Sequence, residues 1–379
     1  MPQLDGLRAL AVVMVLWSHS MPVAYQYVLN THIGFIGVQL FFVLSGFLIS
    51  GILLDISKRG TSSQTKYFGL RQFYIRRFLR IFPLYYMVLL LAVLFKVPPL
   101  PDNWPWHAAY LSNFWLWDVA NTKDFPVHFC GNHFWSLSVE EQFYLFWPMV
   151  ILFVPKKLRL WSILVLVGVA PLFRLIMELG HLGKNPELAT YLTPANLDSL
   201  GLGALLAYAD RYPFIAPSRL ARALLVFGLA GFILNYITGW PGVLMQTLFA
   251  SLFGWLVWKA SQGFGGHFGK FLQCRTVAYL GKISYGVYVI HLFALAFWYW
   301  ALYAAPVPGY RVFARLHVPP GVYSHPAITL LMISIITIPL AHVSFRFYET
   351  PLNNLKRFFP YFKSGFPPAP IHRQSIGSC

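Results

Sequence analysis

The sequence predicts an all-α integral membrane protein with about ten transmembrane helices. Of its 379 residues, 57% are apolar and only 11% are charged, whereas soluble domains carry about 25% charged residues. Apolar runs recur along the chain between short connectors rich in lysine and arginine, and a helix needs about 20 such residues to cross a bilayer. The chain is therefore expected to fold within a cell membrane.

Ten apolar segments are expected to span the bilayer. In chain order they are residues 7–23, 33–54, 78–97, 135–154, 160–177, 190–208, 221–237, 243–258, 283–304 and 326–347. The first segment is similar to a secretory signal peptide, but it lacks a small-residue cleavage site and carries Asp5 where such peptides are basic. We therefore interpret it as an uncleaved helix.

The distribution of basic residues predicts the orientation. One set of alternate connectors holds most of the lysine and arginine. The other set holds far fewer, and Arg311 and Arg315 are the one awkward pair there. Basic loops stay in the cytoplasm, so an even number of spans places both termini there. Residues 1–349 would form the transmembrane domain, and the Pro-rich, basic residues 350–379 a loose cytoplasmic tail.

The net charge of +17 does not indicate a nucleic-acid partner. Nucleic-acid binders gather basic residues on one polar face, whereas here they lie in the connectors. The three cysteines, Cys130, Cys274 and Cys379, are too few and too scattered for a cysteine-based metal site, and no metal is expected.

Two ionisable residues mark the first helix, and such residues at membrane depth tend to be functional. Arg8 and His19 are eleven residues apart, which puts them within about 20° of the same face and about 16 Å apart along the axis. A neutral imidazole can accept a proton, as a general base must. We predict that His19 is catalytic, although a hydrogen bond between helices would also explain it.

A basic run opens the third predicted helix. Arg76, Arg77 and Arg80 are three or four residues apart, so their guanidinium groups can converge. Forked cationic donors suit phosphates, and the run, with Arg8, is predicted to bind the phosphates of acyl-coenzyme A. Membrane topology or the binding of lipid headgroups would equally explain these arginines.

Two acidic residues enter the membrane with the fourth predicted helix. Glu140 and Glu141 lie about 20 Å above its inner end, at about the level of His19, so either one is predicted to orient or charge-stabilise the imidazole. The alternative is a solvated helix start capped by Ser136 or Ser138.

The remaining candidates are an ion pair and a group of cavity residues. Arg174 and Asp198 fall in adjacent helices and are expected to pair for structure. His291 lies seven residues after Ser284 on one face of the ninth helix, where it is either a satisfied core histidine or part of a cavity. The predicted cavity-lining residues are Ser45, Trp135, Ser284, Tyr285 and His291.

Six stretches of the sequence are similar to the acyltransferase-three family of membrane O-acyltransferases. They are residues 4–10 (LDGLRAL, followed by His19), 41–49 (FFVLSGFLI), 77–83 (RFLRIFP), 135–143 (WSLSVEEQF), 283–291 (ISYGVYVIH) and 348–351 (YETP). The resemblance runs in order across nearly the whole chain. It implies a ten-helix acyltransferase that modifies surface glycans or other exported molecules, commonly by O-acetylation.

The resemblance also assigns residues. The family's arginine and histidine of the first helix fall on Arg8 and His19, and its paired arginines fall on Arg77 and Arg80. Some members carry an additional periplasmic hydrolase-like domain at the C-terminus. This sequence ends without one, so a separate periplasmic or extracellular protein would have to carry out any second transfer.

Together these observations predict an enzyme that transfers an acyl group from cytoplasmic acyl-coenzyme A to a hydroxyl of an exported or cell-surface glycan. The acyl group expected is acetyl. Acyl-coenzyme A is a co-substrate, and no permanently bound cofactor is expected. His19 would deprotonate the hydroxyl or carry the acyl group itself. The alternative is a transporter of a glycan or acylated intermediate, in which the same charges relay protons.

Overall fold

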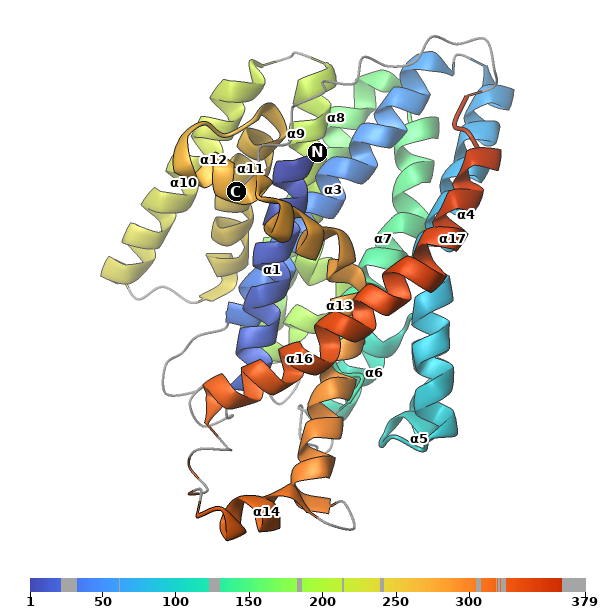
Figure 1. The fold of residues 1–379 in the computed structure, drawn as a ribbon. Helices are drawn as coiled ribbons and strands as arrows, with labels where there is room; N and C mark the ends of the chain where they lie inside the picture. Colours follow the sequence, from blue (N-terminus) through green and yellow to red (C-terminus); the bar gives the residue numbers. More distant parts are fainter. Residues whose placement is uncertain are drawn as a thin grey trace.

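The computed structural model describes residues 1–21, 33–60, 62–122, 130–182, 186–212, 215–238, 242–304, 308–317, 319, 321 and 325–362. Within these ranges the chain forms helices and no strand, which confirms the all-α prediction. Figure 1 shows a bundle in which the first residue, the end of α3 and the start of α4 lie at one end, called the N-terminal end below. α5, α6 and α14 lie at the opposite end.

Seven of the described helices are long and apolar enough to cross a membrane, which confirms a multi-pass membrane protein. They are α3 (Ile33–Arg59), α4 (Ser63–Leu94), α8 (Lys156–Leu179), α10 (Pro217–Thr238), α11 (Met245–Gln262), α13 (Arg275–Tyr299) and α16 (Pro326–Ser344). The three other predicted spans are helices as well: α1 (Pro2–Ser20), α7 (Phe134–Phe153) and α9 (Leu197–Arg211). The total of about ten spans stays a prediction.

α9 starts later than the sequence predicts. The span expected from residue 190 begins with two 3₁₀ turns, η1 (Pro186–Tyr191) and η2 (Thr193–Asn196), and regular helix follows only from Leu197. The Asn196 side chain donates to the carbonyls of Thr190 and Leu192 at 2.7 and 3.0 Å. Side-chain bonds of this kind compete with the helical backbone, which explains the delay.

Short helices complete the described chain. They are α5 (Leu100–Ala108), α6 (Ser112–Thr122), η3 (Gly242–Leu244), α12 (Gly266–Gln273), η4 (Trp300–Ala304), α14 (Gly309–Arg315), η5 (Phe345–Glu349), α17 (Thr350–Asn354) and η6 (Leu355–Phe358). The tail predicted from residue 350 thus starts with helical turns. Its residues 363–379 lie outside the described residues.

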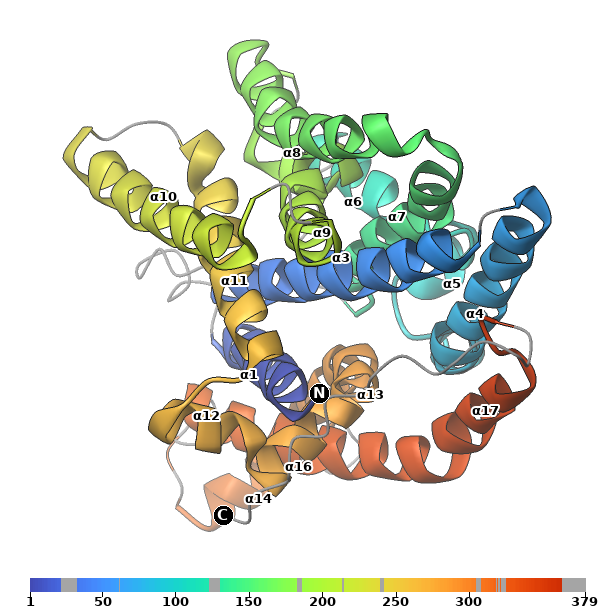
Figure 2. The ribbon, with the colours of Figure 1, turned by 90° about the horizontal axis from the view of Figure 1, so that it is seen from above.

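The centre of the bundle is formed by α1, α3 and α13. α1 packs on both of the others, and α3 packs on α9. Viewed along the bundle, these helices lie near the middle, with α8 and α10 on one side and α16 and α17 on the other (Figure 2). Leu7, Val43 and Val287 are fully buried there.

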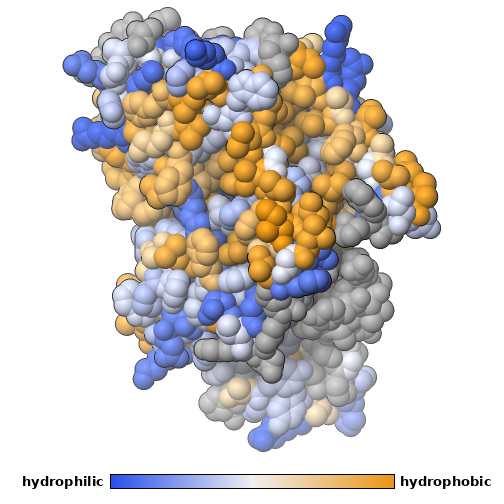
Figure 3. Space-filling view, turned by 180° about the vertical axis from the view of Figure 1, so that it is seen from behind, coloured by the Kyte–Doolittle hydropathy of each residue, from blue (hydrophilic) through white to orange (hydrophobic). Residues whose placement is uncertain are grey.

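The outer surface is apolar. Val165 of α8 is 61% exposed and Ile335 of α16 is 55% exposed, which in water would be unfavourable. Figure 3 shows apolar side chains in a broad band, with hydrophilic residues gathered toward the two ends of that face. The band suits contact with lipid.

Glycines bring α3 and α9 into backbone contact. A Cβ on Gly46 would lie 2.0 Å from the Leu200 carbonyl oxygen, and one on Gly203 would lie 2.2 Å from the Val43 carbonyl oxygen. Small residues permit such close approach between membrane helices, as the sequence 41–47 indicates. Beside this contact the amide of Gln39 is buried and donates to Asn196 Oδ1 at 3.0 Å.

Gly46→Ala is expected to destabilise the protein by about 1–3 kcal/mol, because the added methyl group overlaps the α9 backbone. The measurement is the apparent melting temperature of the purified protein in one detergent. Gly168→Ala in α8 is the matched control, since a Cβ there has no neighbour within 4 Å and alanine favours a helix by about 0.5–1 kcal/mol. Equal melting temperatures for the two variants would contradict the close contact.

Candidate active site

A cavity of about 240 Å³ lies between α1, α3, α4, α7 and α13. Its wall includes charged side chains from three helices: Arg8, Arg77, Arg80, Glu140 and Glu141. Hydroxyl groups from α3, α7 and α13 add to it: Ser45, Ser136, Tyr144, Ser284, Tyr285 and Tyr288. The rest of the wall is apolar, so the cavity combines a charged part with an apolar passage.

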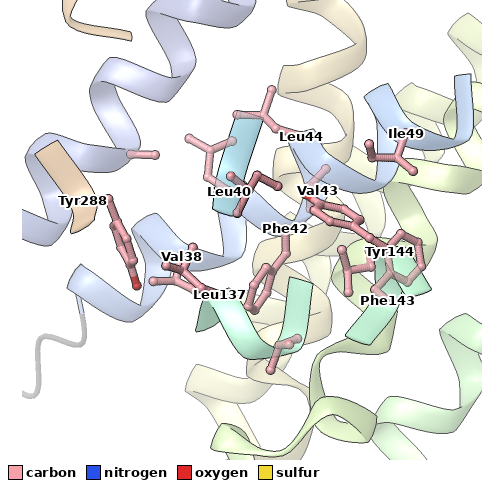
Figure 4. Close-up of a cluster of buried hydrophobic side chains, with 14 of the residues drawn as sticks. Val38, Leu40, Phe42, Val43, Leu44, Ile49, Leu137, Phe143, Tyr144 and Tyr288 are labelled. Atoms are coloured by element: carbon pink, nitrogen blue, oxygen red, sulfur yellow. The ribbon is translucent and has the colours of Figure 1, made fainter. Parts of the chain in front are cut away.

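α3 provides the longest wall. Its contributing residues follow a helical repeat of three and four: Val38, Phe41, Phe42, Ser45, Leu48, Ile49 and Ile52. From the first to the last of these, the helix rises about 21 Å. Figure 4 shows the side chains of Val38 and Phe42 facing Leu137 of α7. The cavity is therefore elongated along the bundle.

Three of the four predicted donor-binding arginines meet at this cavity. Arg8 pairs with Asp5, with Nη1 2.6 Å from Oδ1. The Arg77 guanidinium lies over the rings of Phe73 and Tyr144, at 5.7 and 5.3 Å from their centroids. Arg80 is exposed and interacts electrostatically with Arg8 and Arg77. Three positive charges that line one cavity favour a bound anion.

Arg76 has different neighbours. Its Nη1 donates to the carbonyl oxygens of Lys356 and Phe359, at 2.8 and 3.0 Å. Its guanidinium also lies over the Tyr361 ring, 4.7 Å from the centroid. It is not part of the cavity wall, so the structure separates Arg76 from the other three arginines.

Both predicted glutamates line the cavity. Glu140 accepts a hydrogen bond from Ser45 Oγ at 2.7 Å and one from the Tyr144 hydroxyl at 3.1 Å. The first bond joins α3 to α7, the second lies within α7, and together they fix the carboxylate in the wall. The sequence led us to expect that a glutamate orients His19, whereas the described contacts of Glu140 are with Ser45 and Tyr144.

His19 is oriented by its own helix. Its Nδ1 lies 3.0 Å from the Val15 carbonyl oxygen. A carbonyl only accepts, so Nδ1 must donate, and a neutral ring then has its lone pair on Nε2. That tautomer suits a general base.

Two further histidines stand beside His19. The His291 ring lies 4.9 Å from the His19 ring and 4.7 Å from the His133 ring, measured between centroids. His291 Nδ1 is 2.6 Å from the Tyr288 carbonyl oxygen, and His133 Nε2 is 3.1 Å from the Val289 carbonyl oxygen. By the same reasoning each has its lone pair on the other nitrogen. These three residues are called the histidine cluster below.

Tyr288 joins the histidine cluster to the cavity. Its ring lies 5.5 Å from the rings of both His133 and His291. Its hydroxyl lies 2.5 Å from Ser136 Oγ, and both residues line the cavity. None of the three histidines lines the cavity itself. The histidine cluster therefore lies behind the part of the wall that Tyr288 forms.

The other cavity predictions divide in two. Ser45, Ser284 and Tyr285 line the cavity, whereas Trp135 and His291 do not. Trp135 stacks on Phe35, with centroids 6.0 Å apart.

Sequence reasoning missed His133, and it gave Ser136, Tyr144 and Tyr288 no cavity role. His133, Ser136, Glu140 and Tyr144 follow one another at three- and four-residue spacing, which places them on one face of α7. That spacing was the available signal. The predicted span starts at Trp135 and leaves His133 in a connector.

The expected ion pair is present, and neither residue lines the cavity. Arg174 Nη2 lies 2.7 Å from Asp198 Oδ2, and both side chains are buried. Arg174 also donates to Val243 O, Gln246 Oε1, Thr247 Oγ1 and Ala195 O. The guanidinium therefore links α8, η2, η3, α9 and α11.

No group of three or more His, Cys, Asp or Glu side chains in the described ranges is arranged to hold a metal ion.

Comparisons with known proteins give one family and several relatives. A family model described as an acyltransferase domain matches residues 1–344. The chain is 28% identical over 384 residues to the peptidoglycan O-acetyltransferase OatA of Listeria monocytogenes, covering 96% of this chain and 57% of the relative. It is 29% identical over 397 residues to the O-acetyltransferase OatA of Staphylococcus aureus, covering 97% of this chain and 60% of the relative. The chain thus spans less than two thirds of these relatives, and no solved structure matches it.

Proposed function

The chain belongs to the acyltransferase 3 family, and on that premise we propose that it is a membrane O-acetyltransferase acting on a cell-wall glycan. The acetyl group would come from acetyl-coenzyme A. The observation that carries the proposal is the elongated cavity, which has arginines at one part and the histidine cluster behind its far side. The names of the two OatA relatives support the acetyl group, and the Listeria name supports the glycan.

The arginines of the cavity are proposed to hold the donor. Guanidinium groups bind phosphates through paired hydrogen bonds, and Arg8, Arg77 and Arg80 come from two helices to one cavity. The apolar passage along α3 gives room for the extended thioester arm. The N-terminal end of the bundle would face the cytoplasm, in line with its basic connectors, where acyl-coenzyme A is found.

The acceptor is proposed to reach His19 from the other side. His19 is in the last turn of α1, toward the end of the bundle opposite the N-terminus. Its Nε2 takes the proton from the acceptor hydroxyl as that oxygen attacks the thioester carbonyl. The new C–O bond forms, the C–S bond breaks, and the proton passes to the departing thiolate. The thioester and the hydroxyl would meet beside Tyr288 and Ser136.

The test is release of free thiol from acetyl-coenzyme A by the purified full chain in detergent, with and without soluble peptidoglycan fragments. Acceptor-dependent thiol release, with O-acetylated fragments found by mass spectrometry, would support the proposal. If acetyl-coenzyme A is not consumed while glycan moves into sealed vesicles that contain the protein, the transporter alternative is correct instead.

Arg80→Ala is expected to raise the KM for acetyl-coenzyme A by about 10- to 100-fold, because hydrogen bonds to charged groups contribute about 1.5–3 kcal/mol. The rate constant at saturation should change little, since the phosphates lie far from the reacting carbonyl. Arg71→Ala is the matched control, an exposed arginine on the same helix. A KM for Arg80→Ala equal to that of the control would remove Arg80 from the donor site.

A further inference from the structure

The segment that follows the family match packs along α4. The match ends at residue 344, and α17 and η6 come after it, both in contact with α4. Figures 1 and 2 both show α17 beside α4. Tyr348, just before α17, donates from its hydroxyl to the Pro83 carbonyl at 3.3 Å. Residues 350–362 are called the C-terminal strap below.

Arg76 fixes the strap in place. Its two hydrogen bonds to the Lys356 and Phe359 carbonyls hold the backbone of η6 and of the residue that follows it, and the Tyr361 ring lies over its guanidinium. The strap is also held from α3, because the Arg59 guanidinium lies over the Phe362 ring, 4.6 Å from the centroid. The backbone position of Lys356 is thus set by several contacts.

Lys356 lies outside the cavity wall but beside the arginines of α4, because its backbone carbonyl accepts from Arg76, which is about one helical turn from Arg80. It is partly buried, and its strongest electrostatic interaction is with Arg80, followed by Arg77 and Arg76. Its Nζ donates to Asn353 Oδ1, a neutral acceptor. The next residue, Arg357, is exposed and lies over the Phe358 ring instead. Of these two neighbouring cations, only Lys356 therefore lies with the arginines of α4.

These cations repel one another, and they outnumber the four acidic groups near them, Asp5, Glu140, Glu141 and Glu349. Asp5 pairs with Arg8, Glu140 is bonded to Ser45 and Tyr144, and the buried carboxylate of Glu349 accepts from Ser344 Oγ. A bound polyanion would relieve the repulsion among the cations. Arg80 and Arg77, the cavity arginines that interact with Lys356, are parts of the proposed donor site.

We propose that Lys356 is a further phosphate ligand of the acyl-coenzyme A site and that the C-terminal strap holds it there. This inference rests on the proposed function. Lys356 contributes an ammonium group with three donors to the phosphates that Arg77 and Arg80 bind. Arg76 acts as a positioning residue, since it holds the strap rather than the ligand.

The experiment compares Lys356→Gln, Lys356→Arg and Arg357→Gln in the full chain, purified in a neutral detergent. Lys356→Gln is expected to raise the KM for acetyl-coenzyme A about tenfold with an unchanged kcat. Lys356→Arg restores most of the affinity because it keeps the charge, and Arg357→Gln matches the wild type. With S-acetylpantetheine, a donor that lacks phosphates, Lys356→Gln and the wild type should have the same KM. Lys356→Met, which removes the charge but keeps the length, gives a second reading if the glutamine variant does not fold.

Two results would overturn the inference while leaving the proposed function intact. One is a wild-type KM for acetyl-coenzyme A in Lys356→Gln. The other is a KM that rises equally for acetyl-coenzyme A and S-acetylpantetheine, which would show a general disturbance of the cavity. A wild-type chain that consumes no acetyl-coenzyme A would instead overturn the proposed function, and the inference with it.

A lipid headgroup offers the same phosphate chemistry, so a third arm uses nanodiscs with and without phosphatidylglycerol. If Lys356 belongs to the acyl-coenzyme A site, Lys356→Gln raises the KM for acetyl-coenzyme A about tenfold in both kinds of nanodisc. Loss of phosphatidylglycerol binding in Lys356→Gln, with an unchanged KM for acetyl-coenzyme A, would assign Lys356 to the lipid and overturn the inference.

Discussion

His19→Ala is expected to lower kcat for acetyl transfer by a factor of about 10² to 10⁴, the usual contribution of a general base. The Nδ1 bond to the Val15 carbonyl leaves the Nε2 lone pair as the proton acceptor, and alanine removes it. Binding of acetyl-coenzyme A should stay within about twofold, because His19 is not in the wall of the cavity. Initial rates of thiol release at saturating donor and acceptor measure the effect.

His267→Ala is the matched control for this variant, because His267 is exposed on α12. It should keep the wild-type rate. If His19→Ala retains more than about a tenth of the wild-type kcat, His19 is not the base. His133 and His291, which have the same kind of carbonyl-anchored ring, would then be the residues to replace next.

Arg174→Ala is expected to lower the free energy of unfolding by about 3–5 kcal/mol, because it leaves the Asp198 carboxylate buried without its cation. Asp198 is fully buried, and its remaining donors are Thr247 Oγ1 at 2.6 Å and the Ser199 amide at 2.9 Å. Denaturation in mixed detergent micelles measures the loss.

Arg222→Ala provides the comparison, since Arg222 is exposed on α10 and its described hydrogen bond is to the Ser218 carbonyl of its own helix. Its effect should stay below about 0.5 kcal/mol. Removing both charges, as Arg174→Met with Asp198→Leu, should recover much of the stability. A single Arg174→Ala variant as stable as Arg222→Ala would show that the pair has no structural role.

The helical fold was predictable because the apolar runs are long and follow one another closely. The start of α9 was not, because the bonds of Asn196 to Thr190 and Leu192 depend on the local fold. Hydropathy averages over such a segment and carries no information on side-chain bonds. The number of helices that cross the membrane likewise depends on α1, α7 and α9, where ionisable residues or a short length reduce the apolar signal.

The residues of the candidate site that lie on one helix could be predicted to lie together. Arg77 and Arg80 share a cavity wall, as their spacing on α4 suggests. The partners of Arg76 come from the far end of the chain, and helical spacing says nothing about those. The same applies to His19 and His291, which meet because α1 packs on α13. Contacts between distant helices require the fold.

The contact of α3 with α9 has a consequence for how the protein is made. α3 is synthesised and enters the membrane well before α9, and until α9 arrives the Gln39 amide has neither Asn196 nor Ser199 as a partner. An amide in hydrocarbon without a hydrogen bond costs several kcal/mol. Early in biogenesis α3 must therefore be held by the insertion machinery or by water. α3 reaches its final position only when α9 packs against it, with Gly203 in contact with Val43.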